Sequence, residues 1–102
     1  MAISAKGKRR ISVDGRVYLW RVFNEYDQSW FDCVQVTVAA MDQELFLHYG
    51  MEQPEERRTA MVTRGRPERS ARIPCPRFEG EDGLLTPRGV RQLIEWGLAV
   101  AL

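Results

Sequence analysis

The stretch that decides the fold is Ile11-Ser12-Val13-Asp14-Gly15-Arg16-Val17-Tyr18-Leu19-Trp20-Arg21-Val22-Phe23. Asp-Gly stands here between two apolar runs, and this dipeptide favours a type I′ turn because both central residues need positive φ. The stretch is therefore predicted to form a β-hairpin with Asp14 and Gly15 as its loop. In that register Val13 pairs with Arg16, and Ile11 pairs with Tyr18.

The strands of this hairpin carry apolar side chains on two faces. Cross-strand partners share a face. One face then contains Ile11, Val13, Tyr18, Trp20 and Val22. The other face contains Val17, Leu19 and Phe23. A strand that is apolar on both faces is typical of a central strand covered from both sides.

Further strands are predicted downstream of the hairpin. Residues 33–40 alternate with a period of two, because the valines at 34, 36 and 38 face one way while the polar residues at 35 and 37 face the other. A short connection leads to a strand over 44–51, which favours antiparallel pairing. A helix over 41–49 is the alternative, and it fits the aromatic residues there less well. A short fifth strand is predicted over 59–63.

The C-terminal segment is predicted to be a helix that begins at Thr86. Threonine is a good N-cap, and Pro87 suits the first helical position. An apolar stripe recurs at helical spacing: Val90, Leu93, Ile94, Gly97 and Ala101. The opposite side is filled by Arg88, Arg91, Gln92 and Glu95. Gly97 is expected to let the helix approach a strand closely.

Residues 64–85 contain three prolines and three glycines, and an irregular loop rich in arginine and proline is predicted there. The predicted fold class is α+β: an antiparallel meander of four or five strands with one C-terminal helix packed on one face. This domain is expected to span 9–102, after a flexible basic tail over 1–8.

The composition excludes several classes of protein. The chain has 102 residues, of which 44% are hydrophobic and 28% charged, as expected of one folded domain. No apolar run approaches the ~20 residues that span a bilayer, and no apolar segment follows the basic N-terminus as in a signal peptide. With two cysteines and one histidine, we expect no disulfide framework, no metal and no cofactor. These features favour a bacterial-type cytoplasm.

The sequence offers no convincing catalytic group, so an enzyme is not expected. His48 is predicted to lie on the sheet surface or to be partly buried. Cys75 stands among arginines that could lower the pKa of its thiol, and it is the one thiol worth testing for reactivity. The carboxylate pairs at 55–56 and 81–82 are expected to be solvated turns.

Charge is distributed in blocks. Residues 23–56 carry eight acidic and no basic side chains, whereas residues 57–77 carry seven arginines and one glutamate. Two interpretations stay open, because such blocks either neutralise each other in the fold or present a field to a partner.

The arginine-rich segment 57–77 is the predicted nucleic-acid site. Its Arg64-Gly65-Arg66-Pro67 is similar to the core of the AT-hook, a motif that lays arginines into a narrow minor groove. That resemblance implies DNA contacts from these arginines. The full set of candidate nucleic-acid or anion contacts is Arg57, Arg58, Arg64, Arg66, Arg69, Arg72 and Arg88. The alternative is that the segment packs against the acidic residues of 23–56.

Two interpretations stay open for Arg88 and for the aromatic pair Trp30 and Phe31. Arg88 lies in the first turn of the predicted helix, where it accompanies a bound anion or pairs with Glu81 or Asp82. Trp30 and Phe31 follow a polar loop, and they form a partner interface or cap the protein's own core.

Both ends of the chain resemble a set of small uncharacterised bacterial proteins. These pair a hairpin of the DGxxYxWR type, here residues 14–21, with a C-terminal helix of the TPxxVRxLIE type, here residues 86–95. The resemblance implies one compact unit from hairpin to helix and no particular activity. The sequence thus favours a non-catalytic interaction module that binds a protein partner and forms a homodimer. The alternative is a nucleic-acid-binding protein that uses residues 57–77.

Overall fold

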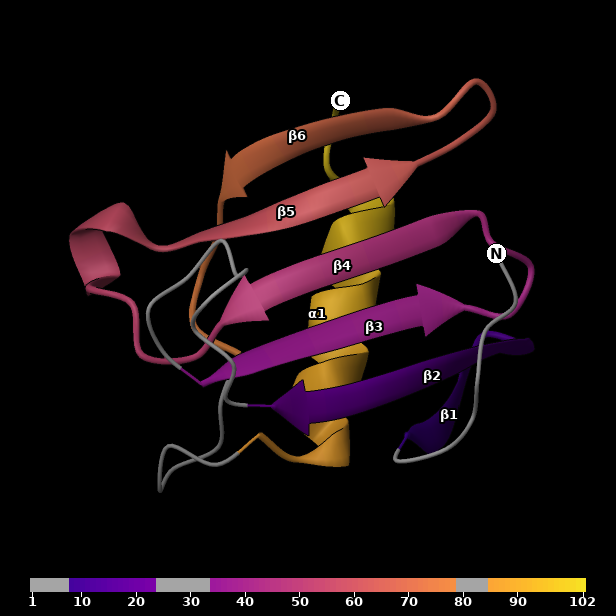
Figure 1. Cartoon of the computed structure of the whole chain (residues 1–102), viewed down its shortest axis with the longest axis horizontal. Coiled ribbons are helices and arrows are strands. Elements are labelled where there is room, and N and C mark those ends of the chain that lie inside the picture. The colour runs from indigo at the N-terminus through magenta and orange to yellow at the C-terminus, as the bar shows by residue number, and fades with distance from the viewer. Residues whose placement is uncertain (1–7, 24–33, 79–84) are drawn as a thin grey trace.

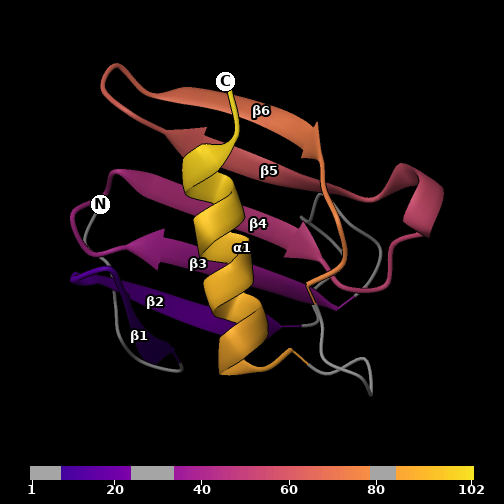
Figure 2. The ribbon, with the colours of Figure 1, turned by 180° about the vertical axis from the view of Figure 1, so that it is seen from behind.

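The computed structural model describes residues 8–23, 34–78 and 85–102. Six strands form one antiparallel sheet in chain order: β1 (Arg9–Val13), β2 (Arg16–Phe23), β3 (Gln35–Ala40), β4 (Leu45–Gly50), β5 (Thr59–Arg64) and β6 (Arg69–Pro74). Helix α1 (Pro87–Ala99) crosses one face of this sheet, and a 3₁₀ helix, η1 (Glu55–Arg57), precedes β5 (Figures 1 and 2). The α+β class and the meander are confirmed, whereas the predicted count of four or five strands is wrong.

The predicted hairpin is confirmed in its loop and in its register. Asp14 has a φ of 51° and Gly15 a φ of 81°, as a type I′ turn requires. Val13 pairs with Arg16, and Ile11 pairs with Tyr18. The next two predicted strands are also found, although their observed bounds are shorter than 33–40 and 44–51.

The core lies between α1 and the sheet. The strands contribute buried apolar side chains that alternate along the chain: Val13, Tyr18, Trp20, Val36, Val38, Ala40, Leu45, Leu47, Tyr49, Ala60 and Val62. Helix α1 contributes Val90, Leu93 and Ile94. The predicted close approach at Gly97 is confirmed, because a Cβ there would lie 2.6 Å from Cδ2 of Leu47 in β4.

The start of α1 is also as predicted. The hydroxyl oxygen of Thr86 accepts a hydrogen bond from the Gly89 backbone N–H at 3.2 Å, and Pro87 is the first helical residue. The predicted polar side of the helix is exposed. The helix ends at Ala99, so Ala101, which was expected to extend the apolar stripe, lies beyond it.

The irregular loop predicted over 64–85 is partly wrong, because its residues 69–74 form β6, which pairs with β5 along its whole length. The prolines do not prevent this. Pro67 lies in the turn between the strands, and Pro74 is the last residue of an edge strand, where a missing N–H is tolerated. Gly65 has a φ of 91° and makes the turn.

Residues 1–7 of the predicted tail lie outside the described residues, and β1 begins at Arg9. Within the ranges that the structure does describe, no helix combines the length and the apolar character needed to cross a bilayer.

Candidate functional site

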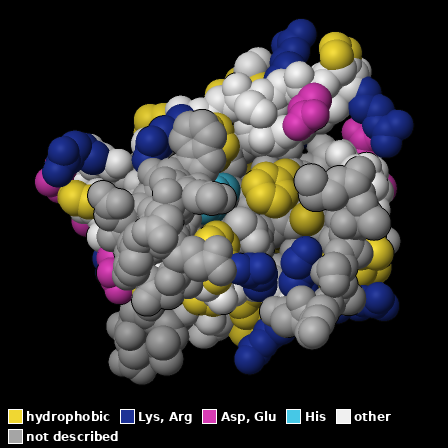
Figure 3. All heavy atoms as spheres, in the orientation of Figure 1, with side chains coloured by type: hydrophobic (Ala, Val, Ile, Leu, Met, Phe, Trp, Pro, Cys, Tyr) yellow, Lys and Arg dark blue, Asp and Glu magenta, His cyan; other side chains and the backbone are white. Residues whose placement is uncertain are grey.

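The face of the sheet opposite α1 carries the candidate site. It is here called the open face because α1 does not cover it, although Leu19, Gln35 and His48 on this face are buried. Its side chains alternate with the core positions: Arg10, Ser12, Val17, Leu19, Arg21, Phe23, Gln35, Thr37, Ala39, Phe46, His48, Thr59, Met61, Thr63, Ser70, Arg72 and Pro74. None of them is acidic, and none of the six described strands contains Asp or Glu. Figure 3 looks onto this face, on which arginine or lysine side chains and hydrophobic side chains are visible. The strands therefore present only positive charge here.

A row of cross-strand partners runs across the middle of the open face. Arg21 pairs with Thr37, which pairs with His48; His48 pairs with Met61, which pairs with Arg72. This central row thus has an arginine at each end. Adjacent strands lie about 4.8 Å apart, so the row extends roughly 19 Å from β2 to β6.

His48 lies in the middle of this row and is buried. A hydrogen bond of 2.5 Å joins its Nε2 to Oε1 of Gln35, which is fully buried. Since the amide oxygen can only accept, Nε2 carries the proton. The Phe23 ring lies 6.0 Å from the imidazole, centroid to centroid. Burial lowers the pKa of His48 below its ordinary value, and the positive charge of Arg72 lowers it further.

The lowered pKa of His48 predicts a pH dependence of stability. The unfolded chain takes up this proton near pH 6.5, whereas the folded chain takes it up only at lower pH. The contribution of His48 to the free energy of unfolding is therefore fully present above about pH 6.5 and is lost as the pH falls toward the folded pKa. Urea denaturation of the wild type and His48→Gln from about pH 8 to about pH 5 tests this. The stability difference between the two should shrink on acidification; two curves that stay parallel would contradict it.

The arginines at the ends of the row are oriented by their neighbours. The Arg21 guanidinium lies 4.5 Å from the centroid of the Phe23 ring, a cation–π contact. Arg72 donates from Nε to the hydroxyl oxygen of Thr59 at 2.9 Å. These contacts hold each guanidinium at its own end of the row.

A hollow lies on the open face between the β3–β4 turn and the β5–β6 turn. Its volume is about 710 Å³, within the range of about 300–1,000 Å³ typical of ligand sites. It is lined by Gln43, Phe46, Thr63, Arg64, Gly65, Arg66, Pro67 and Glu68. The Phe46 side chain is 40% exposed, one of the largest apolar groups that the described surface presents. The hollow therefore joins an accessible aromatic ring to polar groups of the β5–β6 turn.

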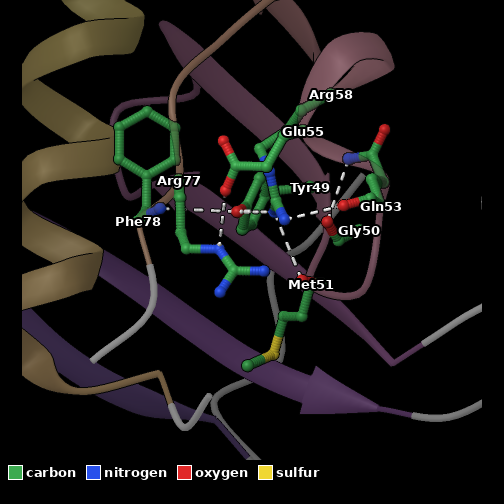
Figure 4. Close-up of polar contacts among 8 residues, drawn as sticks. All are labelled: Tyr49, Gly50, Met51, Gln53, Glu55, Arg58, Arg77 and Phe78. Carbon is green, nitrogen blue, oxygen red and sulfur yellow. Dashed lines mark hydrogen bonds and ion pairs between the residues drawn. The ribbon is translucent and has the colours of Figure 1, made fainter. Parts of the chain in front are cut away.

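Arg58, which is a predicted nucleic-acid contact, is buried inside the fold. It is 2% exposed. Its guanidinium donates to the Tyr49 hydroxyl oxygen, to the Met51 carbonyl at 3.2 Å and to the Gln53 carbonyl at 2.7 Å (Figure 4). The Phe78 N–H donates to the same hydroxyl at 3.4 Å. Arg58 thus ties the segment before β5 to β4, and it is not presented to a ligand.

Arg64 and Arg66, which belong to the predicted AT-hook-like core, are both engaged. Arg64 donates to the carbonyls of Gly97 at 2.8 Å, Leu98 at 3.0 Å and Val100 at 2.6 Å, so it satisfies acceptors at the C-terminal end of α1. Arg66 forms an ion pair with Glu44 at 2.7 Å, although its side chain stays largely exposed.

The remaining predicted arginines do not form one surface. Arg57, Arg69 and Arg88 are exposed, but they lie in η1, at the start of β6 and in the first turn of α1, well apart in Figure 1. Arg72 alone of these candidates stands in the central row. The suggested partners of Arg88, residues 81 and 82, lie outside the described residues, as do Trp30 and Phe31 of the predicted interface.

Among the described residues, two ion pairs connect the acidic and the arginine-rich blocks. Glu44 binds Arg66, and Glu55 binds Arg77 at 3.4 Å. All four side chains are at least partly exposed, so each pair contributes little to stability. These contacts favour the interpretation in which the blocks partly neutralise each other.

The sequence interpretation did not pick out Arg10, Arg21 or Phe46 as site residues. The signal was present, because strict alternation along the strands places all three opposite the core. The same alternation places Arg58 in phase with the buried residues Ala60 and Val62, which indicates that it is not a surface arginine.

Other chemistry receives no support from the described residues. Among them, no three His, Cys, Asp or Glu side chains gather as metal ligands would. Cys75 is half-buried and forms no disulfide there, and its predicted reactivity stays a prediction.

No protein-family model, curated protein or solved structure gives a significant match to this chain.

Proposed function

We propose that this chain is a non-catalytic binding module whose recognition surface is the open face. The observation that carries the proposal is the charge of that face. Arg10 and Arg72 are exposed on it, Arg21 is half-buried there, and no residue of the described strands on this face is acidic. Potentials at interfaces are complementary, so the matching partner is acidic. The exposed Phe46 in its hollow adds an apolar anchor of the kind found at binding surfaces.

A protein of unspecified kind is the partner that the sequence interpretation favours, and a nucleic acid is its alternative. The positive charge of the open face adds that such a protein would offer an acidic segment. A second copy of the chain is a further partner expected from the sequence, and light scattering over a concentration series tests it. The alternative confined to segment 57–77 has less support, because Arg58 is buried and Arg64 is bonded to the end of α1. Arg72 and Arg66 bring part of that segment to the open face and its hollow.

Fluorescence anisotropy with two labelled probes, a poly-glutamate peptide and a single-stranded oligonucleotide of matched length, tests the recognition surface. The double variant Phe46→Ser/Arg72→Ser removes the ring and one end of the central row. The control Leu98→Ser/Arg88→Ser removes an exposed leucine and an exposed arginine from α1, on the other side of the molecule.

We expect at least one probe to bind, the open-face variant to weaken that binding by at least about 10-fold, and the control to leave it unchanged. Loss of binding in the control variant, or no binding of either probe to the wild type, would overturn the proposal.

A further inference from the structure

Resting on the proposed function, we infer that the partner of the open face is single-stranded nucleic acid, with an unpaired base stacked on Phe46. An acidic protein segment would pair only with the arginines of this face. A nucleic acid strand also supplies flat aromatic groups at regular spacing. The open face offers a place for both parts of such a strand, the bases and the phosphates.

The base would occupy the hollow. Phe46 is 40% exposed there, and an accessible ring on an antiparallel sheet is the usual platform for an unstacked base. Gln43 and Thr63 line the same hollow, where the Thr63 hydroxyl shares a hydrogen bond of 2.8 Å with the Ser70 hydroxyl. An amide and a hydroxyl each have more donor and acceptor positions than one partner uses, so both can also meet the edge of a base. Glu68 also lines it, and a carboxylate accepts hydrogen bonds from the exocyclic amino group of a base.

The phosphates would follow the arginines. Arg66 lies beside the hollow, in the β5–β6 turn, and its side chain is 74% exposed. Arg72 lies further along the chain, in β6, at the end of the central row. Arg66 is paired with Glu44 at 2.7 Å, so a phosphate on Arg66 must share its guanidinium with that carboxylate or displace it. Arg21 continues the positive charge to the opposite end of the row on β2. Each of these arginines already has partners, so three phosphate contacts that share or replace those partners predict a slope no steeper than about −2 in a plot of log affinity against log salt concentration.

A single strand fits this surface better than a duplex. Bases in a duplex are stacked on one another and cannot reach a ring that lies on a sheet. Helix α1 lies on the opposite face and cannot enter a groove from the open side. Duplex binding by the Arg64–Pro67 turn would instead require Arg64, whose guanidinium is bonded to three carbonyls.

Anisotropy titrations of the full chain test the inference with three probes: a single strand of about 12 nucleotides, the same strand annealed to its complement, and a poly-glutamate peptide of matched length. We expect the single strand to bind at least about 10-fold more tightly than either other probe. Phe46→Ser should weaken single-strand binding by about 10-fold, whereas Phe46→Trp should retain it because tryptophan also stacks. Leu98→Ser serves as the matched control, and it should change nothing.

The outcomes separate the inference from the proposed function. Tighter binding of poly-glutamate that is still lost in Phe46→Ser/Arg72→Ser overturns the inference and leaves the proposed function standing. Tighter binding of the duplex overturns the inference as well, and it points to the β5–β6 turn. Binding of the single strand that is equally strong in Phe46→Ser overturns the stacking role of Phe46. No binding of any probe overturns both.

Discussion

Replacing Gly89 with alanine should lower the free energy of unfolding by about 3 kcal/mol. Gly89 lies in the first turn of α1, where a Cβ would come within 2.2 Å of the Phe78 carbonyl oxygen. That oxygen belongs to the backbone, so no side-chain rotation relieves the clash. Either the helix or the segment that leads to it must move, and this disturbs the buried contacts of Val90 and Phe78.

Urea denaturation followed by circular dichroism measures the effect, and Gly97→Ala is the natural comparison. There the new methyl group meets the tip of the Leu47 side chain, which can change its rotamer, so we expect a smaller loss of about 1–2 kcal/mol. A Gly89→Ala variant as stable as the wild type would show that α1 does not dock on the sheet as described.

Replacing Arg58 with alanine should cost about 3 kcal/mol, because hydrogen bonds to a charged group are worth about 1.5–3 kcal/mol each and buried acceptors would be left without a donor. Those acceptors include the carbonyls of Met51 and Gln53. The contact with the Tyr49 ring would also be lost. Arg58→Lys should recover only part of the loss, since an ammonium group cannot reproduce the guanidinium fork.

Arg57 provides a matched control for Arg58, because it is the preceding residue, has the same side chain and is exposed. Arg57→Ala should change the free energy of unfolding by less than about 0.5 kcal/mol. Equal small effects of the two substitutions would contradict the burial of Arg58 and return it to the set of surface arginines.

Much of the fold was predictable because its signals are local. The Asp14-Gly15 turn fixes the first hairpin, and its register then assigns every later side chain of β2 to one of two faces. Thr86 and Pro87 mark the start of α1 for equally local reasons.

Strand β6 could not be predicted by the same reasoning. Its sequence, Arg69 to Pro74, is short of large apolar residues and ends in proline, so nothing in its own pattern favours a strand. Its pairing with β5 comes from the turn at Gly65 and from the neighbouring strand, and both act through tertiary context.

The candidate site depends on tertiary structure even more. The sequence interpretation singled out arginines by their density along the chain, whereas in the fold neighbouring arginines lie in different places. Arg58 is buried, Arg64 binds the C-terminal end of α1, and Arg72 lies on the open face. Phe46 becomes prominent only when the β5–β6 turn forms the hollow beside it. Density of charge in a sequence therefore does not identify a surface.

The most direct test of the open face as the recognition surface is nuclear magnetic resonance of the ¹⁵N-labelled chain, titrated with the single-stranded oligonucleotide. The account predicts that the amide shifts that change most belong to the β4–β6 side of that face, around Phe46, Thr63 and Arg72. Changes concentrated instead on the exposed side of α1, around Arg88 and Arg91, would contradict it.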